Sequence, residues 1–387
     1  MNFNKYKISE VGSVITGKTP PTKNEEYFSV EKDKYLFITP RDMNINSKYI
    51  SETERYLTDF VTNKFSSLII DNKSICVSCI GTVGKVFIPK QLSITNQQIN
   101  SITNLKDFCN FDYLYYYLKQ NYKKIQSVAG GTTMPIVNKS SFEGIEIELP
   151  SLSDQLKIVK ILNKIDEKIE LNNEINNNLQ ELSNLNYSEF IKSIEDNEEC
   201  NYKELPELGK ILMGQSPKGE SYNYEKKGLP LINGAADYED GYLKAQKYSS
   251  NPIKICKRDD LLFCIRATIG LLVICDKEYC LGRGVAGITN IDPVYKEYAY
   301  HIIDSSIEDF KRMATGSVIV GISRDNIENI SVKIPTKAEI EKYHSIEKSI
   351  FDKIENIRIE NKKLKELRDT LLPKLMNGEI DLDNIEI

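Results

Sequence analysis

The sequence contains one stretch twice, 185 residues apart, and this duplication limits the folds open to the chain. Residues 130–150 read GGTTMPIVNKSSFEGIEIELP, and residues 315–335 read TGSVIVGISRDNIENISVKIP. Both have a Gly followed by a hydroxyl residue, then a basic residue, then apolar residues at alternate positions closed by a Pro. Because this period is longer than a solenoid unit, the sequence predicts two copies of a whole module.

The match between the two halves continues upstream of this stretch. YKISEVGSVITGKTP at 6–20 is similar to YKELPELGKILMGQSP at 202–217, and the Thr-x-Gly turn at 82–84 is similar to the turn at 268–270. Between these anchors the two halves diverge almost completely. We therefore expect two modules that share borders and differ in their interiors.

Each module begins with a domain part, residues 1–150 in the first and 201–335 in the second. Short alternating apolar runs in these parts are separated by Gly, Pro and Asn, and one helical stretch precedes the repeated motif, at Phe111 to Gln126 and Tyr295 to Met313. This pattern predicts an α+β domain built on a twisted, mainly antiparallel sheet.

Each module ends in a tail, residues 151–200 and 336–387, in which apolar residues recur at alternating spacings of three and four. This spacing predicts long helices with a narrow apolar seam, as in a coiled coil. Asp154 and Glu339 lie at the predicted helix starts, where the helix dipole favours acidic residues. The expected seam positions are Ile158, Leu162, Ile165, Ile169, Asn176 and Leu179 in the first tail, and Ile350, Ile354, Asn361 and Leu364 in the second. Asn176 and Asn361 are equivalent, and each either fixes the helix register from a buried position or lies on the exposed edge of the stripe.

The net charge of −5 is distributed unevenly along the 387 residues. Residues 1–150 carry 18 basic and 15 acidic side chains, and residues 201–335 carry 18 of each. The tails are acidic, with 5 basic and 11 acidic side chains in 151–200 and 10 and 12 in 336–387. The domain parts therefore permit a local phosphate-binding face.

The sequence favours a cytoplasmic protein without a membrane span. The N-terminus has no apolar signal core, and the most apolar stretch, Leu261 to Cys275, is short and interrupted by Arg266. Among eight irregularly spaced cysteines, Cys76 and Cys79 form the one CxxC pair. A metal pair and two buried strand cysteines are both compatible with this spacing, but an alternating strand would point residues i and i+3 to opposite faces. We expect no metal site.

The sequence carries no complete catalytic constellation. It has no HExxH, and its two histidines lie in helical segments. GSVITGKT at 12–19 matches GxxxxGK[ST] and GRGVAG at 282–287 matches GxGxxG, but such short patterns bind phosphate only where a helix follows directly, and Pro20-Pro21 follow the first. The sequence therefore predicts a chain that is not itself an enzyme.

Two divergent domains with repeated borders, each followed by a long helix, resemble the specificity subunit of a type I restriction-modification system. The resemblance covers essentially the whole chain. It is carried by Gly17-Lys18-Thr19-Pro20 with Gly214-Gln215-Ser216-Pro217, by the Thr-x-Gly turns and by the Gly-hydroxyl loops. ELPSLSDQLKIVKILNKID, which begins at Glu148, resembles the family's Leu-Pro-x-Leu-x-x-Gln start of its helix. The second helix start departs from that pattern, because Ile340 stands where the first has Gln155.

The resemblance implies two target recognition domains, residues 1–150 and 201–335, that each read half of a split target in double-stranded DNA. The spacer helices, 151–200 and 336–387, would form an antiparallel coiled coil and dock two methyltransferase subunits, and the duplication implies a pseudo-two-fold repeat. The chain itself would hold no cofactor. S-adenosylmethionine, ATP and Mg would belong to the methyltransferase and restriction or translocase partner subunits.

Polar residues in and around Gly-flanked loops are the candidate DNA contacts, because phosphate contacts position a protein and base-edge contacts give specificity. The alternative interpretation of each candidate is an ordinary polar side chain on the protein surface. The candidates are Lys18, Thr19, Lys85, Asn96, Gln97, Gln98, Thr132, Thr133 and Lys139 in the first half, and Gln215, Ser216, Arg266, Thr268, Arg283, Ser317 and Arg324 in the second. Because residues shared by both domains cannot specify different bases, we expect base-reading residues in the unmatched interiors, 21–73 and 218–258.

Three alternatives stay open from the sequence. The first keeps the architecture in a specificity subunit of a fused restriction-methylation enzyme of the type IIB kind. The second is a coiled-coil scaffold that does not bind DNA, which the acidic net charge would suit. The third, a self-sufficient enzyme, is opposed by the lack of an HExxH motif and of histidines outside the helical segments. The target bases and the length of the gap between half-sites do not follow from the sequence.

Overall fold

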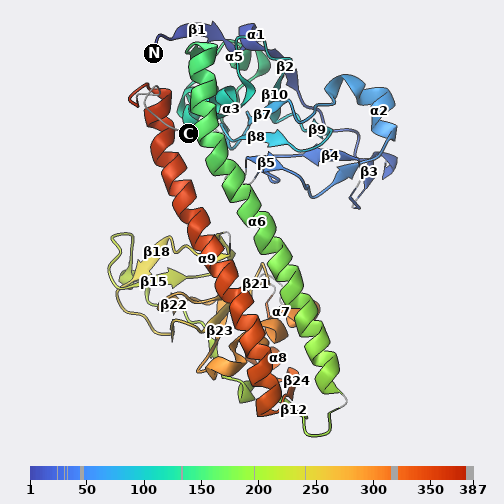
Figure 1. Ribbon diagram of the computed structural model, residues 1–387, viewed down its shortest axis with the longest axis vertical. Coiled ribbons are helices and arrows are strands. Elements are labelled where there is room, and N and C mark those ends of the chain that lie inside the picture. Colours follow the sequence, from blue (N-terminus) through green and yellow to red (C-terminus); the bar gives the residue numbers. More distant parts are fainter. Residues whose placement is uncertain are drawn as a thin grey trace. The chain divides into compact units, whose positions relative to one another are not determined.

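The computed structural model describes residues 1–23, 25–29, 31–32, 34–43, 48–131, 134–195, 197–239, 241–314 and 321–380. They form two compact units. Unit 1 comprises Met1–Asn172 and the segment that begins at Ile359, and unit 2 comprises Asn173–Arg358. Each unit thus contains one domain part and a section of both long helices, α6 (Leu152–Glu195) and α9 (Lys337–Met376), which are green and red in Figure 1. The predicted long helices are confirmed.

Unit 1 contains a five-stranded sheet in the order β2-β10-β7-β8-β5, antiparallel except for the β5–β8 pair. These strands are β2 (Ser13–Thr16), β5 (Tyr49–Ile50), β7 (Ile75–Ser78), β8 (Val86–Pro89) and β10 (Ile99–Thr103). A four-stranded sheet, β3-β6-β4-β9, holds β3 (Phe28–Ser29), β4 (Tyr35–Ile38), β6 (Tyr56–Leu57) and β9 (Ser93–Thr95). The α+β class with mainly antiparallel sheets is as predicted.

The remaining elements of unit 1 are a strand pair and short helices. Strand β1 (Asn4–Lys7) pairs with β11 (Glu146–Leu149), so the start of the chain is held against the segment that leads into α6. The short helices are α1 (Ile8–Val11), α2 (Phe60–Phe65), α3 (Phe111–Gln120), α4 (Tyr122–Ser127) and α5 (Lys139–Glu143). Three tyrosines of α3, Tyr113, Tyr115 and Tyr116, are fully buried and are among the largest side chains of the core.

Unit 2 repeats this plan with different dimensions. Its main sheet has the order β13-β23-β20-β21 and is antiparallel: β13 (Lys210–Met213), β20 (Leu261–Cys264), β21 (Gly270–Ile274) and β23 (Val285–Thr289). A second sheet holds β14 (Tyr222–Asn223), β15 (Leu229–Ile232), β18 (Lys247–Ser249), β19 (Ile255–Cys256) and β22 (Tyr279–Leu281). Strand β12 (Asn201–Glu204) pairs with β24 (Ser331–Ile334), and the β16–β17 hairpin spans Tyr238–Glu239 and Tyr242–Leu243. The helices are α7 (Lys296–Met313) and α8 (Arg324–Glu328).

The helical stretch expected at Phe111 to Gln126 is divided in two, whereas its counterpart α7 is continuous. The backbone N–H and the side-chain amide of Asn121 both donate to the carbonyl of Tyr117, at 2.9 Å each. The backbone dihedral angles of Asn121, φ −97° and ψ 27°, lie outside the helical range. Asn121 therefore ends α3 before α4 begins.

The two cysteines of the CxxC pair lie on opposite faces of the sheet, as the strand pattern predicts. Cys76 packs in the cluster with Leu36 and Phe87, and Cys79 packs with Val77 and Val83. Burial raises the pKa of Cys76 to about 12 and that of Cys79 to about 11, which keeps both thiols protonated. The described residues bring together no group of three or more His, Cys, Asp or Glu that could hold a metal ion.

Both long helices begin with a capping pair at the position that the sequence predicts. Ser151 and Asp154 exchange hydrogen bonds at the start of α6, and Thr336 and Glu339 do so at the start of α9. The hydrogen bond from Thr336 lowers the pKa of Glu339 to about 2. Helix α9 continues through Pro373 to Met376, because a proline so near the end removes one hydrogen bond from the last turn only. Of the helices in the described ranges, none has an apolar run of the length that a bilayer requires.

The seam residues Ile158, Leu162, Ile165, Ile169, Ile350 and Ile354 are buried, and Leu179 and Leu364 are half-buried. Within unit 1 the helices run antiparallel, since Asn172 of α6 contacts Asn361 of α9 while Asp166 contacts Arg368 further along. The Asn172 amide donates to Asn361 at 2.9 Å, so Asn361 is a buried polar contact between the helices. Its equivalent Asn176 is half-buried, and its side-chain oxygen has no hydrogen-bond partner among the described residues.

Unit 1 attaches its domain part to the helices through a buried polar network. The hydroxyl of Tyr116 on α3 donates to Asp166 of α6 at 2.5 Å, and Arg368 of α9 donates to the other oxygen of Asp166 at 2.8 Å. Lys48 extends the network, because its ammonium group lies 2.7 Å from Asp112 and 2.9 Å from Asn163. One carboxylate therefore joins three helices.

Unit 2 makes the corresponding attachment with other residues. His301 of α7 is 185 positions after Tyr116 and is also buried. Its Nε2 lies 2.8 Å from the Ser183 hydroxyl of α6, which donates to Glu347 of α9 at 2.5 Å. The two units thus use one equivalent position on α3 and α7 to reach both long helices, with different chemistry.

Gln155 explains the glutamine in the helix-start motif. It is fully buried in the first turns of α6, accepts from the Asn110 N–H at 2.7 Å and donates to the carbonyls of Phe108 and Pro150 at 3.0 and 2.9 Å. It thus ties the start of α6 to the segment that enters α3. Ile340, its counterpart in α9, is equally buried but packs in the apolar core of unit 2.

We predict that Gln155→Leu destabilises unit 1 by about 1–3 kcal/mol, because it leaves the Asn110 N–H and two carbonyls buried without partners. Hydrogen exchange of core peptides in unit 1, followed by mass spectrometry, checks this. Ile340→Leu is the matched control at the equivalent position, and its near-constant volume predicts a smaller effect, confined to unit 2. Unchanged protection in unit 1 of the Gln155→Leu variant would contradict the assigned role.

Candidate nucleic-acid interface

One edge of the main sheet in unit 1 gathers most of the candidate polar residues. Because neighbouring strands are antiparallel, the ends of β2 and β7 and the starts of β10 and β8 all lie at this edge. The loops there are residues 17–20, 79–85 and 95–98, and we call them the loop edge of unit 1. The amide of Cys79 donates to the carbonyl of Gln98 at 2.7 Å, so two of these loops are directly bonded.

Two loops that carry candidate residues, 17–20 and 95–98, contact each other at the loop edge of unit 1. The hydroxyl of Thr19 donates to Gln97 at 2.6 Å, and the backbone N–H of Lys18 donates to the carbonyl of Thr95 at 2.9 Å. Asn96 is buried and exchanges hydrogen bonds with Gln98, which fixes the shape of the loop. Lys18 and Gln97 are exposed.

Unit 2 has the same loop edge, formed by residues 214–217, 265–270 and 281–284 at the corresponding strand ends. The guanidinium of Arg283 donates to the Ser216 hydroxyl at 3.1 Å, and the N–H of Gln215 donates to the carbonyl of Leu281 at 3.0 Å. Arg266 and Thr268 lie exposed in the turn before β21. The backbone of Arg266 forms an isolated antiparallel β-bridge with Gly321.

The hydrogen bond between Ser216 and Arg283 in unit 2 is therefore equivalent to the one between Thr19 and Gln97 in unit 1. Position 97 precedes position 283 by the same 186 residues that separate Gly84 from Gly270. A neutral amide in unit 1 corresponds to a cation in unit 2. The backbone frame of the edge is thus shared, while the chemical groups that it presents differ.

The repeated glycines at 17 and 214 allow the loops to approach this closely. A Cβ on Gly17 would lie 2.2 Å from the Thr95 hydroxyl and 2.3 Å from the carbonyl of Asn96. A Cβ on Gly214 would lie 2.0 Å from the carbonyl of Gly282. Any side chain would force the loops apart, which accounts for the glycine in both copies.

A third loop, which the sequence analysis did not identify, completes each edge. The carbonyl that ends β4, from Ile38, accepts from Asn96, and the carbonyl that ends β15, from Ile232, accepts from Gly282. The turns that follow are capped by Asp42 and Asp237. The equivalence is hidden in the sequence because the second turn is one residue longer. The equivalence could be found in the sequence from one feature: an aspartate follows an apolar strand by four residues in the first half and by five in the second.

Three basic candidates are held by contacts within their own unit. Lys85 donates to the carbonyl of Met43 at 3.0 Å, and Lys139 lies 3.7 Å from Glu143 in the first turn of α5. Arg324, the counterpart of Lys139, pairs with Glu328 at 2.8 Å and donates to the carbonyl of Ile211 at 3.3 Å.

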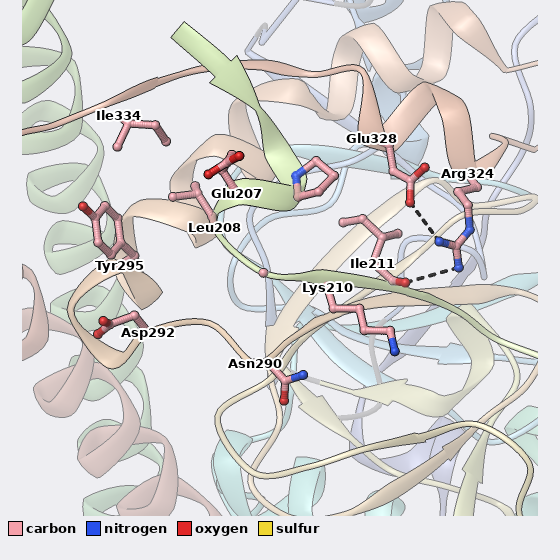
Figure 2. Close-up of a pocket in the computed structure, with 12 residues that line it drawn as sticks. Glu207, Leu208, Lys210, Ile211, Asn290, Asp292, Tyr295, Arg324, Glu328 and Ile334 are labelled. Atoms are coloured by element: carbon pink, nitrogen blue, oxygen red, sulfur yellow. Dashed lines mark hydrogen bonds and ion pairs between the residues drawn. The ribbon is translucent and has the colours of Figure 1, made fainter. Parts of the chain in front are cut away.

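Figure 2 shows Arg324, Glu328 and Ile211 on the wall of a hollow of about 660 Å³ near the start of β13. The contact between Ser216 and Arg283 lies past the other end of this strand. The structure thus places Arg324 apart from that contact. The candidates Thr132, Thr133 and Ser317 lie outside the described residues.

Comparisons with known proteins agree with this arrangement. The sequence model of the type I restriction modification DNA specificity domain matches residues 1–181 and again residues 197–369. The MjaIX specificity subunit of a type I restriction enzyme from Methanocaldococcus jannaschii is 27% identical over 412 residues, covering 98% of this chain and 94% of that protein. The HindI specificity subunit from Haemophilus influenzae is 40% identical over 164 residues, covering 41% of this chain and 35% of that protein.

A solved structure extends the similarity to the fold. The S subunit of the type I restriction-modification system from M. genitalium has a TM-score of 0.56 and 18% sequence identity, covering 97% of this chain and 96% of that one. The two α+β units, each with a section of both long helices and a polar loop edge, form a duplicated fold. The chain belongs to the family of type I restriction modification DNA specificity domains and carries that domain twice.

We predict that Gly17→Ala and Gly214→Ala each open the loop edge of one unit and destabilise it by about 1–3 kcal/mol, the usual cost of overpacking. Exchange of the Lys18 amide, which donates to Thr95, should become faster in Gly17→Ala and stay unchanged in Gly214→Ala. Gly219→Ala is the control, because its Cβ meets no heavy atom within 4 Å. Equal protection of the Lys18 amide in Gly17→Ala and the native chain would contradict the close approach.

Proposed function

We propose that this chain, as a type I restriction-modification specificity subunit with two DNA specificity domains, reads the two halves of a split target in double-stranded DNA. Residues 1–150 read one half and residues 201–335 read the other. The chain brings two adenine methyltransferase subunits to that site, and with them the restriction subunits that translocate and cut. The proposal places the chain in the cytoplasm, with its DNA.

The observation that carries the proposal is the loop edge that is built twice with different side chains. Thr19 with Gln97 and Ser216 with Arg283 occupy equivalent places, so the backbone frame is constant and the hydrogen-bonding groups vary. A protein that must recognise two different half-sites needs this combination. Hydrogen bonds to base edges distinguish base pairs, whereas contacts to phosphates fix the position of the protein.

The charge distribution suits this division of roles. The negative net charge lies in the helical tails, and the domain parts are neutral or mildly basic. Lys18 and Gln215 are exposed at equivalent positions on the two loop edges, next to the hydroxyls of Thr19 and Ser216. We assign Lys18 to the phosphate backbone, which makes binding by unit 1 sensitive to salt.

Partner subunits supply the chemistry in this proposal. S-adenosylmethionine, ATP and Mg would be bound by the partners, and this chain would position them. The outer faces of the helices offer places for docking, because Leu182 of α6 and Leu367 of α9 lie 185 residues apart and are 47% and 48% exposed. Equivalent exposed leucines suit two copies of one partner, such as two methyltransferase subunits.

We predict that replacing residues 21–130 with the interior of another recognition domain changes one half-site and leaves the other half-site intact. The reason is that the two interiors belong to separate units. Sequencing of methylated adenines, with the variant chain and its methyltransferase partner expressed together, measures both half-sites at once.

Two controls accompany this exchange. Replacing residues 218–258 instead should change only the other half-site. The purified chain without its partner should transfer no methyl groups. If both half-sites changed together in either exchange, the assignment of one domain to each half-site would be wrong.

A further inference from the structure

The turns capped by Asp42 and Asp237 share one frame of hydrogen bonds. Asp42 accepts from the N–H of Thr39 at 2.7 Å and from the N–H of Glu54 at 2.9 Å. Asp237 accepts from the N–H of Asn233 at 2.7 Å and from that of Gln246 at 3.4 Å. Each carboxylate thus ties the start of its turn to a later segment, so both turns are held in place by equivalent bonds.

The side chains that these turns present are different. The first reads Thr39-Pro40-Arg41-Asp42 and the second Asn233-Gly234-Ala235-Ala236-Asp237. Counted back from the aspartate, Ala236 takes the place of Arg41, and both residues are exposed. A shared frame that offers a long cation in one unit and a methyl group in the other is what two readers of different sequences require.

The Arg41 side chain is available for an external partner. Its backbone N–H donates to the Thr39 hydroxyl at 3.3 Å, while its guanidinium forms no hydrogen bond or ion pair within the described residues. The other two arginines of unit 1 are engaged, since Arg55 lies 3.7 Å over the ring of Phe28 and Arg368 pairs with Asp166. Arg41 also belongs to an unmatched interior, where residues that specify different bases are expected.

The turn lies at the loop edge of unit 1 rather than elsewhere on the surface. Strand β4 runs parallel to β9, so residues 39–42 leave the small sheet beside the loop that carries Gln97. The ammonium group of Lys85 donates to the carbonyl of Met43, directly after the turn. Arg41 is therefore on the same edge as the polar groups of the proposed DNA contact.

We propose that Arg41 determines specificity in the first half-site by hydrogen bonding to a guanine edge in the major groove. This inference rests on the proposed function. The fork of a guanidinium matches the two acceptors, O6 and N7, that guanine presents there. A lysine has the same charge but lacks the rigid planar fork, so its fit to the two acceptors is less specific. Ala236 lacks any such group, so the second reader makes a different choice at the equivalent place.

The test uses the full chain with its methyltransferase partner on a library of DNA targets with randomised half-sites. Arg41→Ala should lower methylation of the native target on the order of 10- to 100-fold and relax one G·C position of the first half-site. Arg41→Lys should relax the same position with a smaller loss of total methylation, because the charge is retained. The second half-site should keep its sequence in both variants.

Lys73→Ala is the matched control, because Lys73 is an exposed cation in the turn before β7, at the end of the five-stranded sheet opposite the loop edge. It should leave both half-sites unchanged. A uniform loss of methylation over all targets in Arg41→Ala would mean a phosphate contact and would overturn the assignment, as would an unchanged first half-site. If the native complex itself selected no split target, the proposed function would be at fault rather than the role of Arg41.

Discussion

The carboxylate of Asp166 is the point on which the architecture of unit 1 depends. It accepts from Tyr116 of the domain part and from Arg368 of α9 while it belongs to α6. Both charged partners are buried, at 8% and 5% exposure, and a buried charge without its partner is strongly unfavourable. If the domain part rotated or one helix shifted along the other, the buried charge of Asp166 or Arg368 would therefore lose its hydrogen-bond partners. The contact holds the loop edge in a fixed orientation on the helix pair.

Unit 2 reaches the same result through His301, Ser183 and Glu347, and this difference is informative. If the two modules had kept identical networks, α6 of one chain could pair with α6 of a second chain as well as with α9. Here the residue equivalent to Arg368 is Ser183, and the residue equivalent to Asp166 is Phe351. A helix paired with its own copy would thus leave Asp166 facing a serine. The networks favour the pairing of α6 with α9, and with it the presence of two different readers in one protein.

Periodicity and repetition predict the frame of this protein well. The long helices, most of the buried seam, the acidic residues Asp154 and Glu339 at the helix starts and the α+β domains follow from local spacing. The networks around Asp166 and Glu347 do not, because their members are between 46 and 202 residues apart and carry no common pattern. The equivalence of the two aspartate-capped turns cannot be predicted from the repeat, for another reason. One inserted residue in the second turn breaks the alignment of the repeats. Residue type alone marks the candidates at the loop edges, and the structure adds that Thr19 contacts Gln97 and Ser216 contacts Arg283.

We propose that this one chain selects a split DNA target with two different readers. The most direct test of this proposal is the sequencing of methylated adenines in the native genome, with the gene intact, deleted and restored on a plasmid. We expect a two-part motif with unlike halves that is methylated in the intact strain, unmethylated in the deletion and methylated again on complementation. Persistence of every methylated motif after deletion, in a strain where the intact gene and its methyltransferase partner are expressed, would contradict it.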